Sequence, residues 1–222
     1  MKKAVKLTLW LLLSAALLFF LWIQDGCPAL TAEKAFHRME SRYLLPESRF
    51  KGLASLGYLR SGTANYQRYL AAGVTDTHLH MAEVRKKALL WYVMDRWDNS
   101  VASVPLEGDT TVGIAPDSWP CDYHFFCYTT LPAQQWVATV TVGDLSYTTE
   151  GTCDPSGFTL FRFRQLKNCP EAISASLKAL AYDMIGIGYH KTDKTMDIFL
   201  AVTLFDANGQ PVGFGAKDYP LS

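Results

Sequence analysis

VATVTVGDLSYTTEG, residues 137–151, holds two runs rich in β-branched and aromatic residues on either side of Gly143 and Asp144. Such side chains favour the extended conformation of a β-strand. A two-residue pair that begins with glycine, placed between two such runs, is typical of a tight hairpin turn. The stretch therefore predicts an antiparallel β-hairpin.

Strand patterns recur on both sides of this hairpin, from about residue 46 to residue 165 and again near the end of the chain. Residues 78–81 alternate histidine with leucine or methionine, and FTLFRFR at 158–164 alternates as well. Because successive side chains of a strand point to opposite faces, such alternation predicts half-buried strands. A second hairpin is predicted where MDIFLAVTLF and QPVGFG flank the turn at residues 206–209.

Two amphipathic helices accompany these strands. The first is predicted over residues 31–45, where Thr31 can cap the start and Pro46 disfavours helix at the preceding residue. The second is predicted over residues 170–184, with Pro170 at its start. Their apolar stripes consist of Ala32, Phe36, Met39 and Tyr43 in the first helix and of Ile173, Leu177, Leu180, Ala181 and Met184 in the second. The sequence thus predicts an α+β domain built mainly of antiparallel sheet.

An apolar segment precedes this domain. Residues 7–23 contain no charge and follow three lysines, Lys2, Lys3 and Lys6. As a helix the segment would be about 25 Å long at 1.5 Å per residue, close to the ~30 Å thickness of a bilayer core. Lysines on its short leading side predict a cytoplasmic N-terminus and an extracytoplasmic body. We therefore expect a single-pass transmembrane anchor in residues 1–27, a juxtamembrane helix after it, and one extracytoplasmic domain in residues 28–222.

Cleavage of this segment remains an alternative. A signal peptide needs small residues one and three positions before the cut, and cuts after Gly26, Ala29 or Ala32 all lack the pair. Acylation of Cys27 as a lipoprotein is a further alternative, although Gln24 and Asp25 do not fit that motif. We favour the uncleaved anchor.

The charge balance restricts the partners. Lys and Arg total 21, as do Asp and Glu; without Lys2, Lys3, Lys6 and Asp25 the remaining chain has 18 basic and 20 acidic residues. A body this close to neutral lacks the basic surface that nucleic acid binding requires. We expect no nucleic acid partner.

Four cysteines lie in the predicted extracytoplasmic body, which favours two disulfides. Their spacing does not match that of zinc-binding cysteines. Three pairings are possible; joining Cys121 to Cys127 and Cys153 to Cys169 closes the shortest loops and is the pairing we favour. Free buried thiols are the alternative.

The string TDTHLHM at residues 75–81 resembles the His-x-His motif of metal-dependent hydrolases of the amidohydrolase, TatD-like deoxyribonuclease and polymerase-and-histidinol-phosphatase groups. The resemblance implies a metal bound by His78 and His80 that activates water, and His124 could supply a third ligand. Only 142 residues follow His80, whereas those barrels have about 250. The favoured interpretation is that His78 and His80 lie on the solvent face of a strand and that His124 is structural, so no cofactor is expected.

Aromatic residues suggest another kind of site. Exposed tryptophans can stack on sugar rings, which would suit a wall-binding module, although packing in the core is the favoured interpretation. The candidates are Trp91, Trp97, Trp119 and Trp136.

The whole layout, with its leading lysines, anchor, TAEKAFHRME helix and VTLFDANGQPV hairpin, resembles uncharacterised membrane-anchored exported proteins of Gram-positive anaerobic bacteria. That resemblance implies a fold type and a location at the cell membrane, and it brings no assigned activity. We expect a non-catalytic module that binds an envelope protein or a wall polymer. A metal-dependent hydrolase using His78 and His80 is the alternative.

Overall fold

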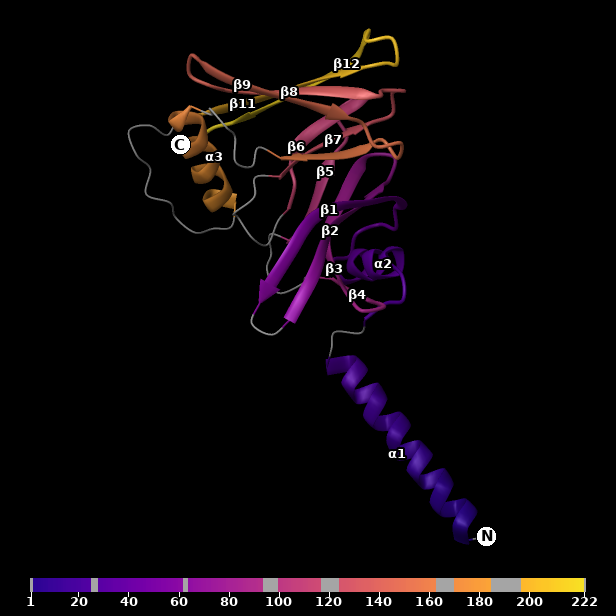
Figure 1. The fold of residues 1–222 in the computed structure, drawn as a ribbon. Helices are drawn as coiled ribbons and strands as arrows, with labels where there is room; N and C mark the ends of the chain where they lie inside the picture. The colour runs from indigo at the N-terminus through magenta and orange to yellow at the C-terminus, as the bar shows by residue number, and fades with distance from the viewer. Residues whose placement is uncertain are drawn as a thin grey trace.

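The computed structural model describes residues 2–24, 28–61, 64–93, 100–116, 124–162, 170–184 and 197–221 (Figure 1). These residues form an α+β fold with mostly antiparallel sheets, as predicted. The described helices are α1 (Lys2–Gln24), α2 (Ala32–Arg42) and α3 (Glu171–Met184).

The strands form three antiparallel sheets, which we call A, B and C. Sheet A has the order β1-β2-β3-β4, with β5 paired to β3; sheet B has the order β10-β7-β6, and sheet C the order β12-β11-β8-β9. Sheet A consists of β1 (Arg49–Ser61), β2 (Ala64–Val74), β3 (His78–Lys87), β4 (Leu90–Val93) and β5 (Val101–Pro105). Sheet B consists of β6 (Thr110–Ile114), β7 (His124–Thr129) and β10 (Phe158–Arg162). Sheet C consists of β8 (Gln135–Val142), β9 (Leu145–Thr152), β11 (Ile198–Phe205) and β12 (Pro211–Tyr219).

Both predicted hairpins are confirmed, and they make up sheet C. Val142 pairs with Leu145, so Gly143 and Asp144 form the two-residue turn, and Gly143 has the positive φ of 56° that such turns require. In the closing hairpin, β11 pairs with β12, and Gly209 supplies a φ of 74° in the turn. Pairing of β11 with β8 joins the two hairpins into one sheet.

Strand β7 lies between two cores, because sheet B is covered on both faces. Phe125 and Cys127 pack with the inner face of sheet C and with α3, whereas Phe126 and Tyr128 pack with sheet A. All six residues of β7 are buried. The sequence HFFCYT therefore shows no alternation of apolar and polar residues, although the strand alternates between the two cores.

Helix α2 covers the other face of sheet A. Phe36 and Met39 pack there against Ala71, Ala82 and Val84 in a third core. Thr31 caps the helix as predicted, accepting the Lys34 N–H at 3.2 Å. The helix ends at Arg42, before the predicted residue 45, because the chain turns at Leu44, which has a φ of 55°.

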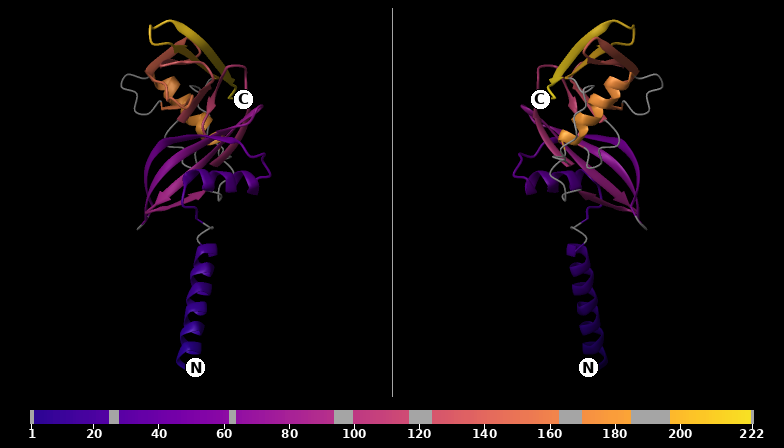
Figure 2. Two further views of the ribbon diagram at one scale, coloured as in Figure 1. Left: turned by 90° about the vertical axis from the view of Figure 1, so that its right-hand side faces the viewer. Right: turned by 90° about the vertical axis from the view of Figure 1, so that its left-hand side faces the viewer.

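Helix α1 projects away from the body, and sheet C lies at the opposite end of the molecule (Figures 1 and 2). The side chains described for its residues 5–20 are all exposed. Close to α1, the body begins with a β-bridge in which Ala29 and Trp91 exchange two backbone hydrogen bonds of 2.8 Å. Among the described residues, no helix is found that is both long enough and apolar enough to span a membrane.

The position of β7 leads to a stability prediction. Phe126 is 1% exposed and Phe214, on the outer face of sheet C, is 61% exposed. Replacing Phe126 with alanine should lower the free energy of unfolding by about 3–5 kcal/mol, because it leaves a cavity between sheets A and B. Urea denaturation followed by tryptophan fluorescence measures this change.

The matched control is Phe214→Ala, which should change the free energy of unfolding by less than about 0.5 kcal/mol. Equal losses in the two variants would show that β7 does not lie between two packed cores.

Candidate functional site

The three histidines of the predicted metal site lie in different surroundings. His78 is partly exposed at the start of β3, and its Nδ1 is 2.9 Å from the hydroxyl of Thr77. His80 is 1% exposed and faces α2, so it does not lie on a solvent face as we expected. His124 is buried at the start of β7, in sheet B. Over the described ranges, no group of three or more His, Cys, Asp or Glu side chains is placed to hold a metal ion.

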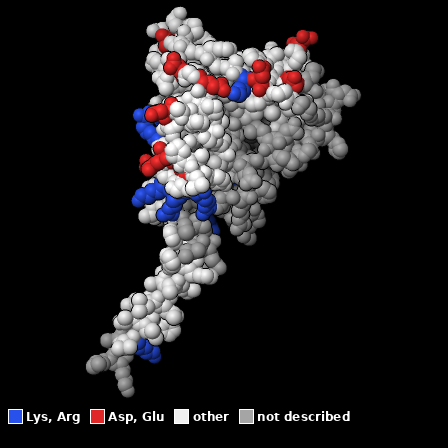
Figure 3. Space-filling model, turned by 180° about the vertical axis from the view of Figure 1, so that it is seen from behind, with Lys and Arg blue, Asp and Glu red and all other residues white. Residues whose placement is uncertain are grey.

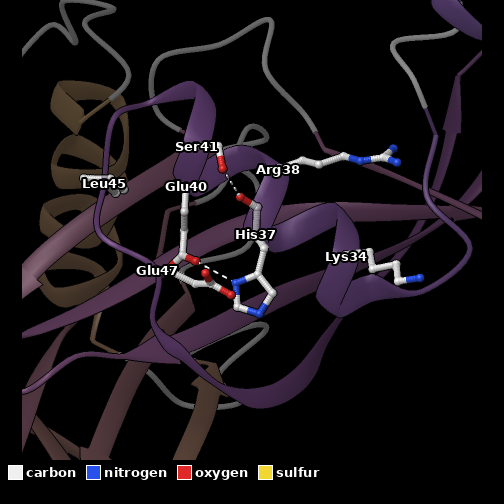
Figure 4. Close-up of a pocket in the computed structure, with 7 residues that line it drawn as sticks. All are labelled: Lys34, His37, Arg38, Glu40, Ser41, Leu45 and Glu47. Atoms are coloured by element: carbon white, nitrogen blue, oxygen red, sulfur yellow. Dashed lines mark hydrogen bonds and ion pairs between the residues drawn. The ribbon is translucent and has the colours of Figure 1, made fainter.

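The structure instead brings His80 to a carboxylate on α2. Glu40 Oε1 lies 2.8 Å from His80 Nδ1. Glu40 Oε2 lies 2.7 Å from His37 Nδ1 (Figure 4). Glu40 Oε2 also accepts the backbone N–H of Ser48 at 3.3 Å. Because an ionised carboxylate only accepts hydrogen bonds, each imidazole donates its Nδ1–H to Glu40. The result is a buried carboxylate between two histidines.

Hydrogen bonds keep this carboxylate ionised. Burial, the largest single effect, raises the pKa of Glu40, but the interactions with Ser48, His80 and His37 together outweigh it. The pKa of Glu40 therefore lies below its ordinary value. The glutamate, 1% exposed, carries its charge at neutral pH and holds α2 to β3.

Gly73 allows α2 to approach the sheet at this point. Gly73 pairs with His80 on the neighbouring strand. A Cβ atom at Gly73 would overlap the Ser48 hydroxyl and lie 2.6 Å from Cε1 of Phe36. Only a residue without a side chain lets Phe36 and Ser48 pack this closely, and their packing positions Glu40 over His80.

A small pocket lies on the outer side of this cluster (Figure 4). Its volume is about 280 Å³, at the lower limit for small-molecule sites. It is lined by Lys34, His37, Arg38, Glu40, Ser41, Leu45 and Glu47.

His37 is the residue of the pocket that Glu40 orients. Glu40 orients the His37 ring through Nδ1, and the other ring nitrogen, Nε2, lies 3.9 Å from the exposed carboxylate of Glu33. A histidine held this way can accept a proton, as in acid–base catalysis. The hydroxyl of Ser41, however, donates to the backbone carbonyl of His37 at 3.1 Å, so it is not directed at the imidazole. The described lining of the pocket thus holds an oriented base without an adjacent nucleophile.

A second buried charged group lies on the opposite face of sheet A. Arg68 donates two hydrogen bonds to Glu83, at 2.9 and 3.0 Å, and Arg85 donates a third at 3.0 Å. Glu83 is fully buried and Arg68 is 4% exposed. A bidentate pair of this kind fixes the register of neighbouring strands, here β2 and β3.

The predicted disulfides and tryptophan sites are only partly within the described residues. Cys127 and Cys153 are free thiols in the structure, whereas Cys121 and Cys169 lie outside the described residues.

The core contains Trp136, which is 7% exposed and donates its indole N–H to the Thr152 carbonyl. Trp91 is half-buried against Tyr69 and Lys86. Trp97 and Trp119 also lie outside the described residues.

The sequence pattern points to His80 but not to Glu40 or His37. One signal was available, because Glu40 follows Phe36 by four residues and so falls on the apolar stripe of the helix. A charged residue on a buried stripe needs a partner. Which partner it has depends on the pairing of segments 40 residues apart, which the sequence pattern does not contain.

Comparisons with protein-family models, curated proteins and solved structures find no match to this chain.

The Glu40 cluster predicts a specific pH dependence. Because the pKa of Glu40 is lower in the folded chain than its ordinary value of 4.5, its contribution to stability is complete above that pH. The contribution is lost as the pH falls through the folded-state pKa. Glu40→Gln should lower the free energy of unfolding by about 1–3 kcal/mol at pH 7. The difference from the wild type should shrink on acidification below pH 4.5, as urea titrations at several pH values would measure.

Glu47→Gln is the matched control, because Glu47 lines the same pocket but is exposed. It should follow the wild type at every pH. If Glu40→Gln also runs parallel to the wild type from neutral to acid pH, the buried carboxylate does not contribute as described.

Proposed function

We propose that this chain is a membrane-tethered protein whose α1 is the anchor and whose body is a non-catalytic binding module on the extracytoplasmic side. The proposal rests on the difference between α1 and the body in the burial of their apolar side chains. The described apolar side chains of the body fill three cores, and none of the described residues of α1 belongs to them. A helix this apolar, left outside every core, favours a non-aqueous environment.

The side chains of α1 support this role. Leu11, Leu12, Leu18 and Phe20 are between 55% and 67% exposed, and they point in different directions around the helix. A helix that is apolar on all sides is suited to the interior of a membrane or of a large protein. Since no helix of the described residues meets both the length and the hydropathy of a membrane span, the anchor role rests on the sequence. In the sequence, the charge-free run over residues 7–23 would be about 25 Å long as a helix, against ~30 Å for a bilayer core.

The junction between α1 and the body also fits a membrane surface. Trp22, near the end of α1, donates its indole N–H to the Pro28 carbonyl at 3.2 Å, and the guanidinium of Arg38 lies over its ring. Lys34, Arg38 and Arg42 are exposed at four-residue intervals along one side of α2. Figure 3 shows basic side chains gathered where the body meets α1 and acidic ones toward the far end. Tryptophan and basic side chains are favoured beside lipid headgroups.

The orientation follows from the leading lysines. Lys2, Lys3 and Lys6 precede the apolar run, and short basic leaders remain in the cytoplasm. The proposal therefore places the N-terminus in the cytoplasm and residues 28–222 outside.

A binding role is favoured over catalysis by two features of the described residues. The pocket beside Glu40 is small and has no hydroxyl directed at its histidine. By contrast, sheet C exposes Phe199 and Phe214 on its outer face, at the end of the body farthest from α1 (Figure 1). Exposed aromatic side chains are common contacts for proteins and sugars, which suits an envelope protein or a wall polymer as partner. Reproducible hydrolase activity that is lost on a single polar substitution would contradict the non-catalytic assignment.

The tether is tested by flotation of the purified full chain with phosphatidylcholine vesicles. The wild type should float with the vesicles. The double variant Leu12→Arg/Leu13→Arg should float at least tenfold less, because each arginine at the centre of a membrane helix costs about 2.5–3.5 kcal/mol.

Leu12→Met/Leu13→Met is the matched control, since methionine has a similar volume and is also apolar. It should float like the wild type. A wild type that stays in the aqueous fraction, or an arginine variant that floats unchanged, would rule out α1 as the anchor.

A further inference from the structure

Cys127 and Cys153 lie in the same core although they are 26 residues apart in sequence. Cys127 is in the middle of β7, 1% exposed, with its side chain in the core between sheets B and C. Cys153 directly follows β9 and is half-buried against that same core. The two cysteines therefore come from different sheets and pack into the same apolar cluster.

Strand pairing and hydrogen bonds position Cys127 and Cys153 at this core. Cys127 is directly opposite Thr159 in the β7–β10 pair, so both side chains point into the same core. Thr159 Oγ1 accepts the N–H of Asp154 at 3.0 Å, and Asp154 is the residue after Cys153. Cys153 itself donates its N–H to the Gln134 carbonyl at 2.8 Å. Cys153 is thus held beside the strand that faces Cys127.

The two thiols differ in reactivity. Burial, followed by the charge of Cys153, raises the pKa of Cys127 to about 12. Burial also raises the pKa of Cys153. Because Cys153 is more accessible, it is the thiol that an external oxidant reaches first.

We propose that Cys127 and Cys153, which are free thiols in the structure, are oxidised to a disulfide that joins sheet B to sheet C. This pairing differs from the one that the shortest loops favour, in which Cys127 joins Cys121 and Cys153 joins Cys169. Of the cysteines that the structure describes, Cys153 is the one placed at the core that Cys127 occupies. The inference does not depend on the proposed function, since it concerns the packing of the body alone.

The reaction requires an external disulfide, such as oxidised glutathione. The Cys153 thiol gives up its proton to solvent, and the resulting thiolate attacks one glutathione sulfur; the sulfur–sulfur bond of the oxidised glutathione breaks, a mixed disulfide forms and one glutathione thiolate leaves and is protonated. The Cys127 thiol then gives up its proton to solvent and attacks the Cys153 sulfur, which releases the second glutathione thiolate. Two protein thiols are oxidised to one disulfide, and the external disulfide is reduced to two thiols.

Peptide mapping tests the pairing directly. The purified full chain is oxidised with glutathione disulfide, its remaining thiols are alkylated, and it is digested without reduction. Trypsin is unsuitable, because no Lys or Arg lies between Arg96 and Arg162 and all three of Cys121, Cys127 and Cys153 would stay on one peptide. Chymotrypsin cuts after Phe126 and Tyr128 and so isolates Cys127. Mass spectrometry should find the Cys127 peptide joined to the Cys153 peptide, whereas alkylated Cys127 or its linkage to Cys121 or Cys169 overturns the proposal.

A thermal measurement provides a second test. In the variant Cys121→Ser/Cys169→Ser only the proposed pair remains in the body. Its oxidised form should melt on the order of 5–10 °C above its form reduced with dithiothreitol, because the cross-link restricts the unfolded chain. Adding Cys153→Ser gives the matched control, which should show no such difference. Equal melting temperatures of the oxidised and reduced forms of the first variant would contradict the proposal.

Discussion

Strand β7 supplies side chains to two cores at once, and the arrangement of the body depends on it. Phe126 and Tyr128 fill the space against sheet A, while Phe125 and Cys127 fill the space against sheet C. Sheets A and C each have an apolar face that needs a partner, and sheet B, buried on both faces, covers one face of each. The outer face of sheet A is closed by α2. The outer face of sheet C remains exposed, and it is the surface that we assign to partner binding.

Polar contacts add specificity to this apolar framework. Glu40 joins α2 to β3 through His80, and Glu83 joins β2 to β3 through Arg68. A buried carboxylate is tolerated only where donors surround it, so each contact disfavours any other register of these elements. The described polar contacts between helix α1 and the body lie at their junction, where Trp22 meets Pro28 and Arg38. The described cores of the body therefore do not depend on α1, which is consistent with the membrane environment that we propose for this helix.

The sequence was sufficient for the elements whose pattern is local. The hairpin around Gly143, the cap at Thr31 and the start of α3 follow from turn and capping chemistry that acts within a few residues. The three-sheet arrangement was not predictable in the same way, because HFFCYT in β7 has no polar face from which a direction could be inferred. The exposure of His80 was wrongly predicted because the alternation in β3 is typical of a half-exposed strand, whereas α2 covers one face of β3 and sheet B the other. The candidate site at Glu40 depends on a contact across 40 residues, of which only the charge on an apolar helix stripe was visible.

The central claim is that the body folds as a unit around β7 while α1 resides in a membrane. Hydrogen–deuterium exchange of the full chain in lipid vesicles, resolved to peptides by mass spectrometry, tests both parts together. The account predicts that amides of residues 7–20 exchange as slowly as those of β7, because lipid excludes water from one and the two cores exclude it from the other. Exchange of residues 7–20 at the rate of a water-exposed helix, with β7 still protected, would contradict the proposed tether.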